Sequence, residues 1–98
     1  MTSEEIERLR PFATRYVWWK TAEEALRYPE RLVAQVMNIG TFEDLQLLDE
    51  LVGEEGLRLA LSQAEAGQFN PRSWHYWHYR LGLSRPGEVP SLPIRKTG

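Results

Sequence analysis

The chemically richest part of the chain is the segment at residues 69–80, which gathers aromatic, imidazole and guanidinium side chains. It contains two tryptophans, two tyrosines, both histidines of the chain and two arginines. Asn70 and Pro71 predict that a helix begins here, because Asn caps a first turn well and Pro at the first helical position loses no hydrogen bond. A short helix with these groups can stack on rings, donate hydrogen bonds and attract anions, which favours binding over catalysis.

His75 and His78 lie three residues apart and could be read as a metal-binding pair. A zinc site needs three or four converging ligands, whereas the chain has no cysteine and few acids near this segment. We therefore predict no metal site and no cofactor. The ordinary alternative is that the two histidines pack among the tryptophans, each donating a hydrogen bond to a carbonyl.

Nothing in the sequence predicts an enzyme or a catalytic residue. There is no glycine-rich phosphate loop and no Gly-x-Ser-x-Gly motif. Acidic residues do occur in adjacent pairs, but neighbouring positions on a helix point about 100° apart, so their carboxylates do not converge on one substrate. We interpret these pairs as helix-start and surface charges.

The bulk properties predict a single globular domain. The chain has 98 residues, of which 42% are hydrophobic and 27% charged. It shows neither a secretory leader pattern nor an apolar run that could span a bilayer, so we expect a soluble, cytoplasmic protein. The charge is uneven, with seven acids against one base in residues 41–67 and five bases against one acid in residues 68–98. This asymmetry could orient the molecule toward a charged partner.

Helix start and stop signals recur along the chain and predict five or six short helices. Capping residues and prolines place them from Thr2 to just before Pro11 and at residues 21–28, 29–39, 42–53, 54–66 and 71–81. Gly40 is expected to take the left-handed conformation that ends a helix. Residues 12–20 are aromatic and β-branched but have no strand to pair with. We expect them to form an extended or loosely helical linker whose tryptophans enter the core.

The predicted fold is a compact all-α domain over residues 1–83, followed by an extended, proline-containing tail over residues 84–98. Prolines at positions 86, 90 and 93 exclude a helix in the tail. The tail's apolar residues are expected to dock on this domain or on another chain. The predicted core contains Trp18 or Trp19, Leu32, Val36, Leu45, Leu48, Leu61, Trp74 and Trp77.

The last helix carries more rings than one small core can bury, so some of them are expected to lie exposed until a partner covers them. Trp74 and Trp77 share the face that best fits a core. Tyr76 and Arg80 lie on a flank, where they could stack as a cation–π pair. Tyr and Arg are enriched at the energetic centres of interfaces. The predicted partner-binding residues are Arg72, His75, Tyr76, Tyr79 and Arg80, with Arg85, Leu92 and Ile94 from the tail.

Two stretches of the chain resemble a group of small bacterial proteins of about this length. The first reads VWWKTAEEAL at residues 17–26 and PERLVAQVMNIGT at 29–41, and the second reads FNPRSWHYWHYRLG at 69–82. Members of this group are encoded beside nucleotidyltransferase-like toxins of the AbiEii type. The resemblance therefore implies an antitoxin-like role, and it brings no catalytic residues with it. Many antitoxins that also repress transcription carry a basic DNA-binding element, and none is convincing here.

The leading prediction is a non-catalytic, intracellular protein-binding module, an antitoxin-like partner of a nucleotidyltransferase-type toxin. The alternative is a nucleic-acid-binding regulator that uses the aromatic and basic last helix, as binders of single strands do. The sequence pI of about 5.7 argues against that alternative. The pair of helices at 42–53 and 54–66 has the outline of a helix-turn-helix, but its second helix is too acidic to approach phosphates. A homodimer that buries the aromatic patch is a third possibility.

Overall fold

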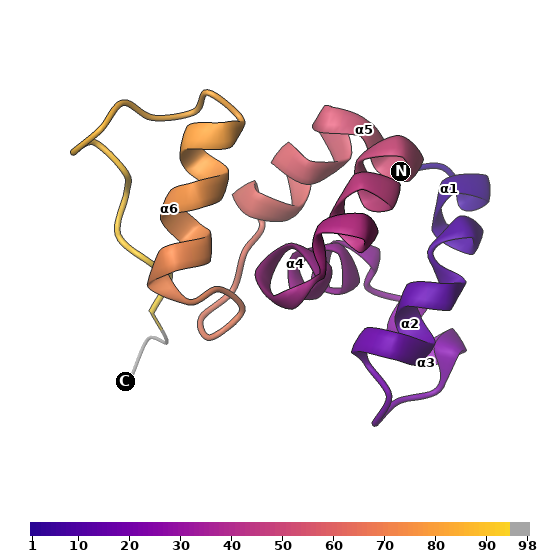
Figure 1. Cartoon of the computed structure of the whole chain (residues 1–98). Helices are drawn as coiled ribbons and strands as arrows, with labels where there is room; N and C mark the ends of the chain where they lie inside the picture. Colours follow the sequence, from indigo (N-terminus) through magenta and orange to yellow (C-terminus); the bar gives the residue numbers. More distant parts are fainter. Residues whose placement is uncertain (95–98) are drawn as a thin grey trace.

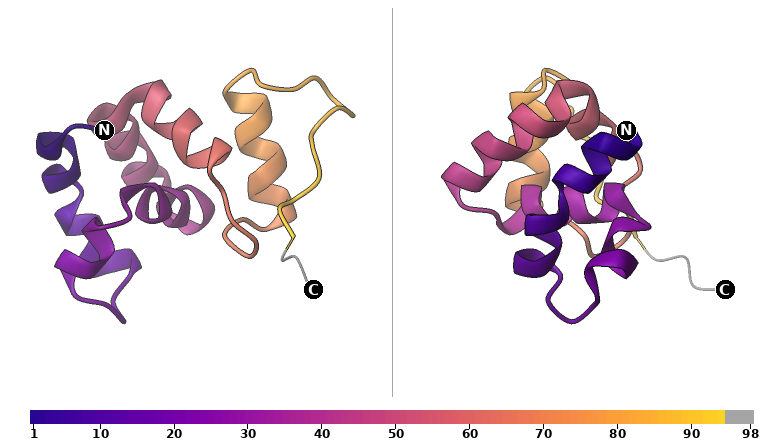
Figure 2. Two further views of the ribbon diagram at one scale, coloured as in Figure 1. Left: turned by 180° about the vertical axis from the view of Figure 1, so that it is seen from behind. Right: turned by 90° about the vertical axis from the view of Figure 1, so that its right-hand side faces the viewer.

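The structure, a computed structural model, describes residues 1–94, in which helices are the only regular secondary structure (Figure 1). The helices are α1 (Ser3–Arg8), α2 (Arg10–Tyr16), α3 (Ala22–Leu26), α4 (Pro29–Ile39), α5 (Phe42–Ser62) and α6 (Pro71–Arg80). The predicted all-α class and helix number are confirmed. Seen from both sides, α1–α3 lie at one end, α6 and the tail lie at the other, and α4 and α5 lie between them (Figure 2).

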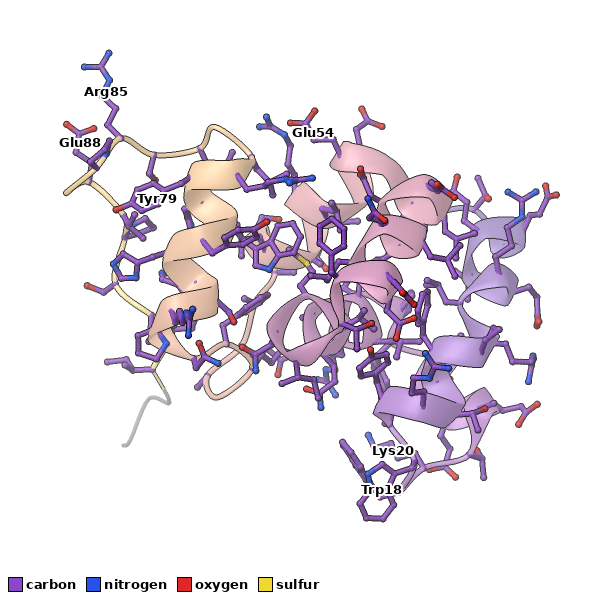
Figure 3. The ribbon with its side chains drawn as sticks, in the orientation of Figure 1. Trp18, Lys20, Glu54, Tyr79, Arg85 and Glu88 are labelled. Carbon is purple, nitrogen blue, oxygen red and sulfur yellow. The ribbon has the colours of Figure 1, made fainter. Side chains whose placement is uncertain are left out.

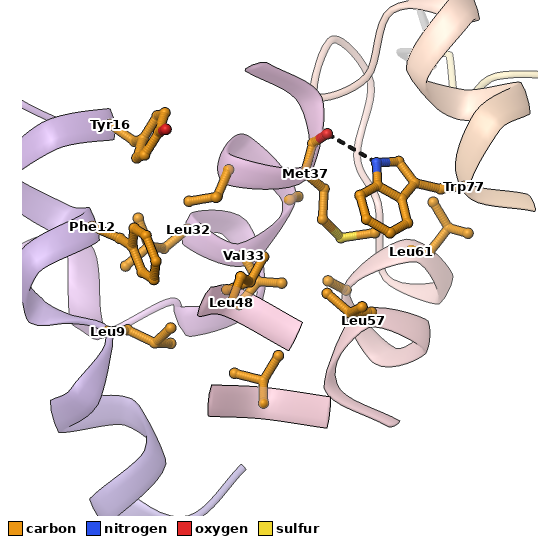
Figure 4. Packing of buried hydrophobic residues seen from close by; sticks show 14 of the residues in the cluster. Leu9, Phe12, Tyr16, Leu32, Val33, Met37, Leu48, Leu57, Leu61 and Trp77 are labelled. Carbon is orange, nitrogen blue, oxygen red and sulfur yellow. Dashed lines mark hydrogen bonds between the residues drawn. The ribbon is translucent and has the colours of Figure 1, made fainter. Parts of the chain in front are cut away.

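The core is centred on α4, which packs against α2, α3, α5 and α6. Its residues Leu32, Val33 and Val36 are buried in one cluster with Leu48 of α5. Figure 4 shows Leu32, Val33 and Leu48 in this cluster. Apolar residues three and four positions apart give α4 this buried stripe. Of the predicted core, Leu32, Val36, Leu48, Leu61, Trp74 and Trp77 are buried, and Leu45 is only partly buried against the cluster.

Residues 12–20 were expected to form an extended or loosely helical linker, but residues 12–16 belong to a regular helix, α2. Pro11 does not simply follow α1; it lies in the first turn of α2, where its missing N–H is not needed. Phe12 and Tyr16 are then four residues apart on one face, so both reach the core, with ring centroids 6.1 Å apart. The aromatic residues that suggested extended chain are the buried stripe of a short helix.

The prediction that Trp18 or Trp19 enters the core is also wrong. The backbone N–H of Lys20 donates to the carbonyl of Val17 at 3.1 Å, so the chain turns sharply at the two tryptophans. Their side chains are 76% and 57% exposed, respectively. Because α2 uses Phe12, Ala13 and Tyr16 to cover the core, the residues after its last turn have no inward position left to fill.

The predicted division between the helices at 42–53 and 54–66 is found at Gly53, where the backbone is not helical. Residues 42–62 form α5, which bends where Gly53 adopts φ 67° and ψ 177°. A positive φ of this kind is open to glycine at little cost. The prediction of a left-handed Gly40 is wrong, because its backbone is extended, with φ −68° and ψ 153°. The extended backbone at Gly40 leads directly into Thr41, whose side chain accepts from the Asp44 N–H and caps α5.

A buried polar cluster ties α2 to the start of α5. The Asp44 carboxylate accepts hydrogen bonds from the Tyr16 hydroxyl and from Arg15, the latter at 2.8 Å and 3.0 Å. The Tyr16 oxygen accepts in turn from the Thr41 N–H at 3.4 Å. The hydrogen bond from Tyr16 contributes most, followed by that from Arg15, and together they lower the pKa of Asp44 below its ordinary value. The cluster fixes α2, and with it the turn at Trp18 and Trp19.

Candidate partner-binding surface

Helix α6 is held in place by its cap and by two tryptophans on its inner face. The Asn70 side chain accepts from the Ser73 N–H at 2.8 Å and caps the helix, as predicted. The indole N–H of Trp77 donates to the Met37 carbonyl at 2.9 Å, and that of Trp74 donates to the Pro90 carbonyl at 2.7 Å. Both rings are buried, and so is Leu81 at the end of the helix. The inner face therefore joins α6 to α4 on one side and to the tail on the other.

The opposite side of α6 forms a single exposed surface, which we call the α6 outer face. It consists of Arg72, His75, Tyr76, Tyr79 and Arg80. Their spacings of three and four residues place all five on one side of the helix. Tyr76 is 49% and Tyr79 44% exposed, which agrees with the expectation that not every ring of this helix can be buried. The structure thus brings together all five α6 residues that the sequence singled out.

The α6 outer face carries positive charge without local compensation. Helix α6 contains no acid. Within residues 1–94, Arg8, Arg10, Arg15, Arg31 and Arg58 each form an ion pair with a carboxylate, whereas Arg72 and Arg80 form none. The surface therefore combines half-exposed phenol rings with guanidinium groups that remain available to an anionic partner.

The two histidines do not converge. The Nδ1 atom of His75 lies 2.8 Å from the Pro71 carbonyl oxygen, and Nδ1 of His78 lies 2.7 Å from that of Trp74. His75 is exposed, while His78 is buried at the wall of an open cleft of about 1140 Å³ between α5 and the tail. Among the described residues, no group of three or more histidines, cysteines or acids could hold a metal ion. Each ring instead meets a carbonyl one turn earlier in α6.

The tail residues predicted to bind the partner lie in different environments. The tail leaves the end of α6 and returns along it, where Val89 and Leu92 pack partly against the core (Figure 1). Leu92 thus serves this domain in part, whereas Ile94 is 83% exposed. Arg85 lies at the far bend of the tail, beyond the helix end that carries Tyr79 (Figure 3). Residues 95–98 of the predicted tail lie outside the described residues.

A hollow beside the first turn of α6 is a feature that the sequence did not indicate. Its volume is about 470 Å³, and Arg72 and Tyr76 of the α6 outer face line it together with Met37, Asn38 and Leu45. No motif could have revealed it, because it depends on how α4, α5 and α6 meet. The predicted stacking of Tyr76 with Arg80 is not found; the cation–π contact of the described residues places Arg31 over Tyr28, 4.5 Å from the ring centre.

No protein-family model, no curated protein and no solved structure matches the chain. In the described part of the chain, no helix has both the length and the apolar character needed to cross a membrane.

Proposed function

We propose that this chain is a non-catalytic protein-binding module whose partner covers the α6 outer face. The observation that carries the proposal is the pair Tyr76 and Tyr79, half exposed on a helix whose inner face is already fixed by buried tryptophans. Each ring contacts one neighbour in α6, Tyr76 with Trp77 and Tyr79 with His75, and the rest of its surface is open to a partner. Tyrosine and arginine side chains in this arrangement are typical of the residues that dominate binding energy in interfaces.

The charge of the α6 outer face supports a partner with an acidic surface. Arg72 and Arg80 flank the tyrosines, and each offers a planar group that can bind a carboxylate through two hydrogen bonds. The hollow lined by Arg72 and Tyr76 can receive one side chain of that partner. The partner expected from these features presents acids around an apolar or aromatic side chain that enters the hollow.

The resemblance to proteins encoded beside AbiEii-type toxins supports a particular partner, a nucleotidyltransferase-like toxin. An antitoxin that acts by covering its toxin needs an adhesive surface and no chemistry of its own. In that role the α6 outer face would contact the toxin, and the exposed Ile94 with Arg85 would extend the contact. Where a nucleotidyltransferase-like protein is encoded beside this chain, co-expression should relieve its toxicity.

The proposal is tested by single substitutions at the α6 outer face. A pull-down from the native host followed by mass spectrometry first identifies the partner, and calorimetry then gives its affinity. Tyr76→Ala and Arg80→Ala should each weaken binding by about tenfold or more, because truncating an interface centre has effects of this size. Both variants should also lose the relief of toxicity. The melting temperature should stay close to that of the wild type, since both side chains are exposed.

Arg27→Ala is the matched control for the arginine variant. Arg27 is exposed just after α3, at the other end of the molecule, and forms no ion pair within the described residues. The Arg27→Ala substitution removes the same charge as Arg80→Ala and should leave the affinity for the partner unchanged. Equal losses for Arg27→Ala and Arg80→Ala would mean that general charge, rather than the α6 outer face, determines binding. Unfolding of Tyr76→Ala would mean that this ring is structural.

A nucleic-acid-binding function is the second candidate, favoured by one specific observation. Arginines flank the tyrosines on the α6 outer face with no acid on the helix, an arrangement that suits bases stacked along a phosphate backbone. A helix-turn-helix function is less well supported, because Arg58 would be the base of its second helix. The Arg58 guanidinium already donates to the Glu54 carboxylate and to the Leu81 carbonyl. Short single- and double-stranded DNA and RNA, tested at two salt concentrations, decide between the candidates. Binding that falls steeply with salt supports the regulator.

A further inference from the structure

The turn between α2 and α3 presents two tryptophans where a turn normally carries small polar residues. Trp18 and Trp19 are its two central residues, between Val17 and Lys20. Gly, Asn, Asp, Pro and Ser dominate such positions, because they fit the backbone and stay hydrated. Trp18 and Lys20 project from the tip of this turn, at the end of the molecule away from α6 (Figure 3). A sequence that breaks a local rule without a local gain points to a function.

Contacts on both sides of the turn, and between its two rings, favour the conformation in which the rings are presented. They stack edge to face, with centroids 5.6 Å apart and planes at 90°. Before the turn, Val17 is partly buried and its N–H donates to the Ala13 carbonyl at 3.0 Å. After it, the Thr21 side chain accepts from the Glu24 N–H at 3.1 Å and starts α3. A preorganised contact loses little entropy on binding.

A pocket of matching size opens beside the tryptophans. Its volume is about 180 Å³, and its lining includes the aromatic rings of Trp19 and Tyr28 with Val17, Ala25 and Leu32. The other lining residues are polar, namely Lys20, Glu24, Arg31, Gln35 and Gln68. A cavity of roughly 150 Å³ accepts one benzene molecule, so the volume suits a single aromatic side chain, with its ring against the apolar residues and its polar edge toward the others. Arg31 lies over Tyr28 and is itself bound to Glu65 at 2.8 Å, which steadies that wall.

The charges around the pocket are balanced, in contrast to those of the α6 outer face. Lys20 and Glu24 both line the pocket, and neither forms an ion pair within residues 1–94. The Glu24 carboxylate accepts a hydrogen bond from the Thr21 hydroxyl at 3.1 Å. One small surface therefore carries a projecting ring, a pocket for a ring, and one cation and one carboxylate that are not ion-paired with each other or with another described residue. Such a surface is complementary to itself, which is what a two-fold symmetric interface requires.

We propose that the chain self-associates through this surface, with Trp18 of each copy entering the pocket beside Trp19 of the other. Lys20 of one copy then faces Glu24 of its partner. The two tryptophans, 76% and 57% exposed, offer on the order of 300 Å² in each copy. Even with the neighbouring side chains, this area falls in the class of small interfaces, so the dimer is weak and depends on concentration.

Sedimentation equilibrium of the whole chain tests the proposal, over concentrations from about 10 µM to about 1 mM, the weak end of specific affinity. The apparent mass of the wild type should rise with concentration from that of one chain toward twice that mass. Its tryptophan fluorescence should shift to shorter wavelength at the same time. Trp18→Ala should weaken the association at least tenfold. Phe42→Ala is the matched control, because Phe42 is an equally exposed aromatic residue, at 74%, that does not line the pocket, and it should dimerise like the wild type. A wild type that stays monomeric at about 1 mM overturns the proposal.

A charge exchange gives an independent test of the symmetry. Lys20→Glu should weaken the dimer, because two acids would then face each other across the interface. Lys20→Glu combined with Glu24→Lys should restore it. Glu24→Lys also removes the carboxylate that the Thr21 hydroxyl bonds at the start of α3. Melting curves of the variants show whether this change lowers the stability of the fold. A dimer that survives Trp18→Ala, or that is broken by Tyr79→Ala instead, overturns the proposal and leaves the function proposed for α6 unaffected.

Discussion

Two surfaces of this protein expose aromatic rings, and they differ in construction and in charge. The α6 outer face is one side of a helix whose other side is buried, and its rings are flanked by unpaired arginines. The turn at Trp18 and Trp19 has no buried side of its own, and the charges near it are balanced. They lie at opposite ends of the molecule. An all-basic surface suits an acidic partner, whereas a balanced one suits a copy of itself.

The comparison also separates two uses of tryptophan in one small chain. Trp74 and Trp77 are buried, and each indole N–H donates to a backbone carbonyl. Trp18 and Trp19 have no such bond among the described residues and remain exposed. Tryptophan is amphipathic, so burial of the ring requires a partner for its N–H. The tryptophans with a carbonyl within reach build the fold, and those without one are available for binding.

Replacing a buried tryptophan should have the largest effect on stability. We expect Trp77→Ala to lower the free energy of unfolding by about 3–5 kcal/mol, because it leaves a cavity and an unpaired Met37 carbonyl. Trp18→Ala should change it by less than about 0.5 kcal/mol. Urea unfolding followed by circular dichroism measures both. If Trp77→Ala does not fold, Trp77→Phe serves instead, because it keeps a ring but loses the N–H. Its free energy of unfolding should fall by less than the amount expected for Trp77→Ala.

The Asp44 cluster should have an intermediate effect, and through α2 it supports the turn at Trp18. We expect Asp44→Asn to destabilise the fold by about 1–3 kcal/mol, since the buried Tyr16 hydroxyl and Arg15 lose a charged acceptor. Glu43→Gln, at the exposed neighbouring position, should change the stability little. If the two variants melt alike, the cluster contributes nothing specific.

The pH dependence of stability provides a second test of the Asp44 cluster. Tyr16 and Arg15 lower the pKa of Asp44 in the folded chain, so the unfolded chain binds its proton more readily. The resulting stabilisation is fully present above the unfolded value of about 3.9, and it is lost as the pH falls through the lower, folded pKa. Unfolding curves between pH 7 and pH 2 should show a smaller acid loss for Asp44→Asn than for Glu43→Gln. Equal slopes would contradict this assignment.

The fold was largely predictable because its helices begin and end at local signals. Thr2, Thr21, Thr41 and Asn70 each cap the helix that the sequence assigned to them. The five α6 residues of the candidate site were predictable for a related reason, since a helix can bury only one side. Asn70 fixed the start of the helix, and the spacing then fixed which residues share a face.

The turn at Trp18 was not predictable from the same rules. Large apolar residues are usually buried, and the prediction that Trp18 or Trp19 enters the core rested on this tendency. What excluded them was tertiary: Phe12 and Tyr16 had already filled the inward positions of α2. The pocket beside Trp19 depends on Tyr28 and Leu32, which reach it from beyond α3 and from α4. The available signal of an exposed turn was the position of the two tryptophans, which are separated from the Thr21 cap by Lys20 alone.

Salt should have the smallest effect, and it separates the two surfaces without any substitution. Unpaired arginines dominate the α6 outer face. Raising the salt concentration from about 50 mM to about 500 mM should therefore lower its affinity for the partner several-fold, because the charges are screened. The tryptophan contact is mainly apolar, and its Lys20–Glu24 pairs are exposed and add little. Self-association should therefore change by less than about twofold, or strengthen in sulfate, which favours apolar burial. If salt weakened both associations equally, charge would determine both, and the contrast between the two surfaces would be wrong.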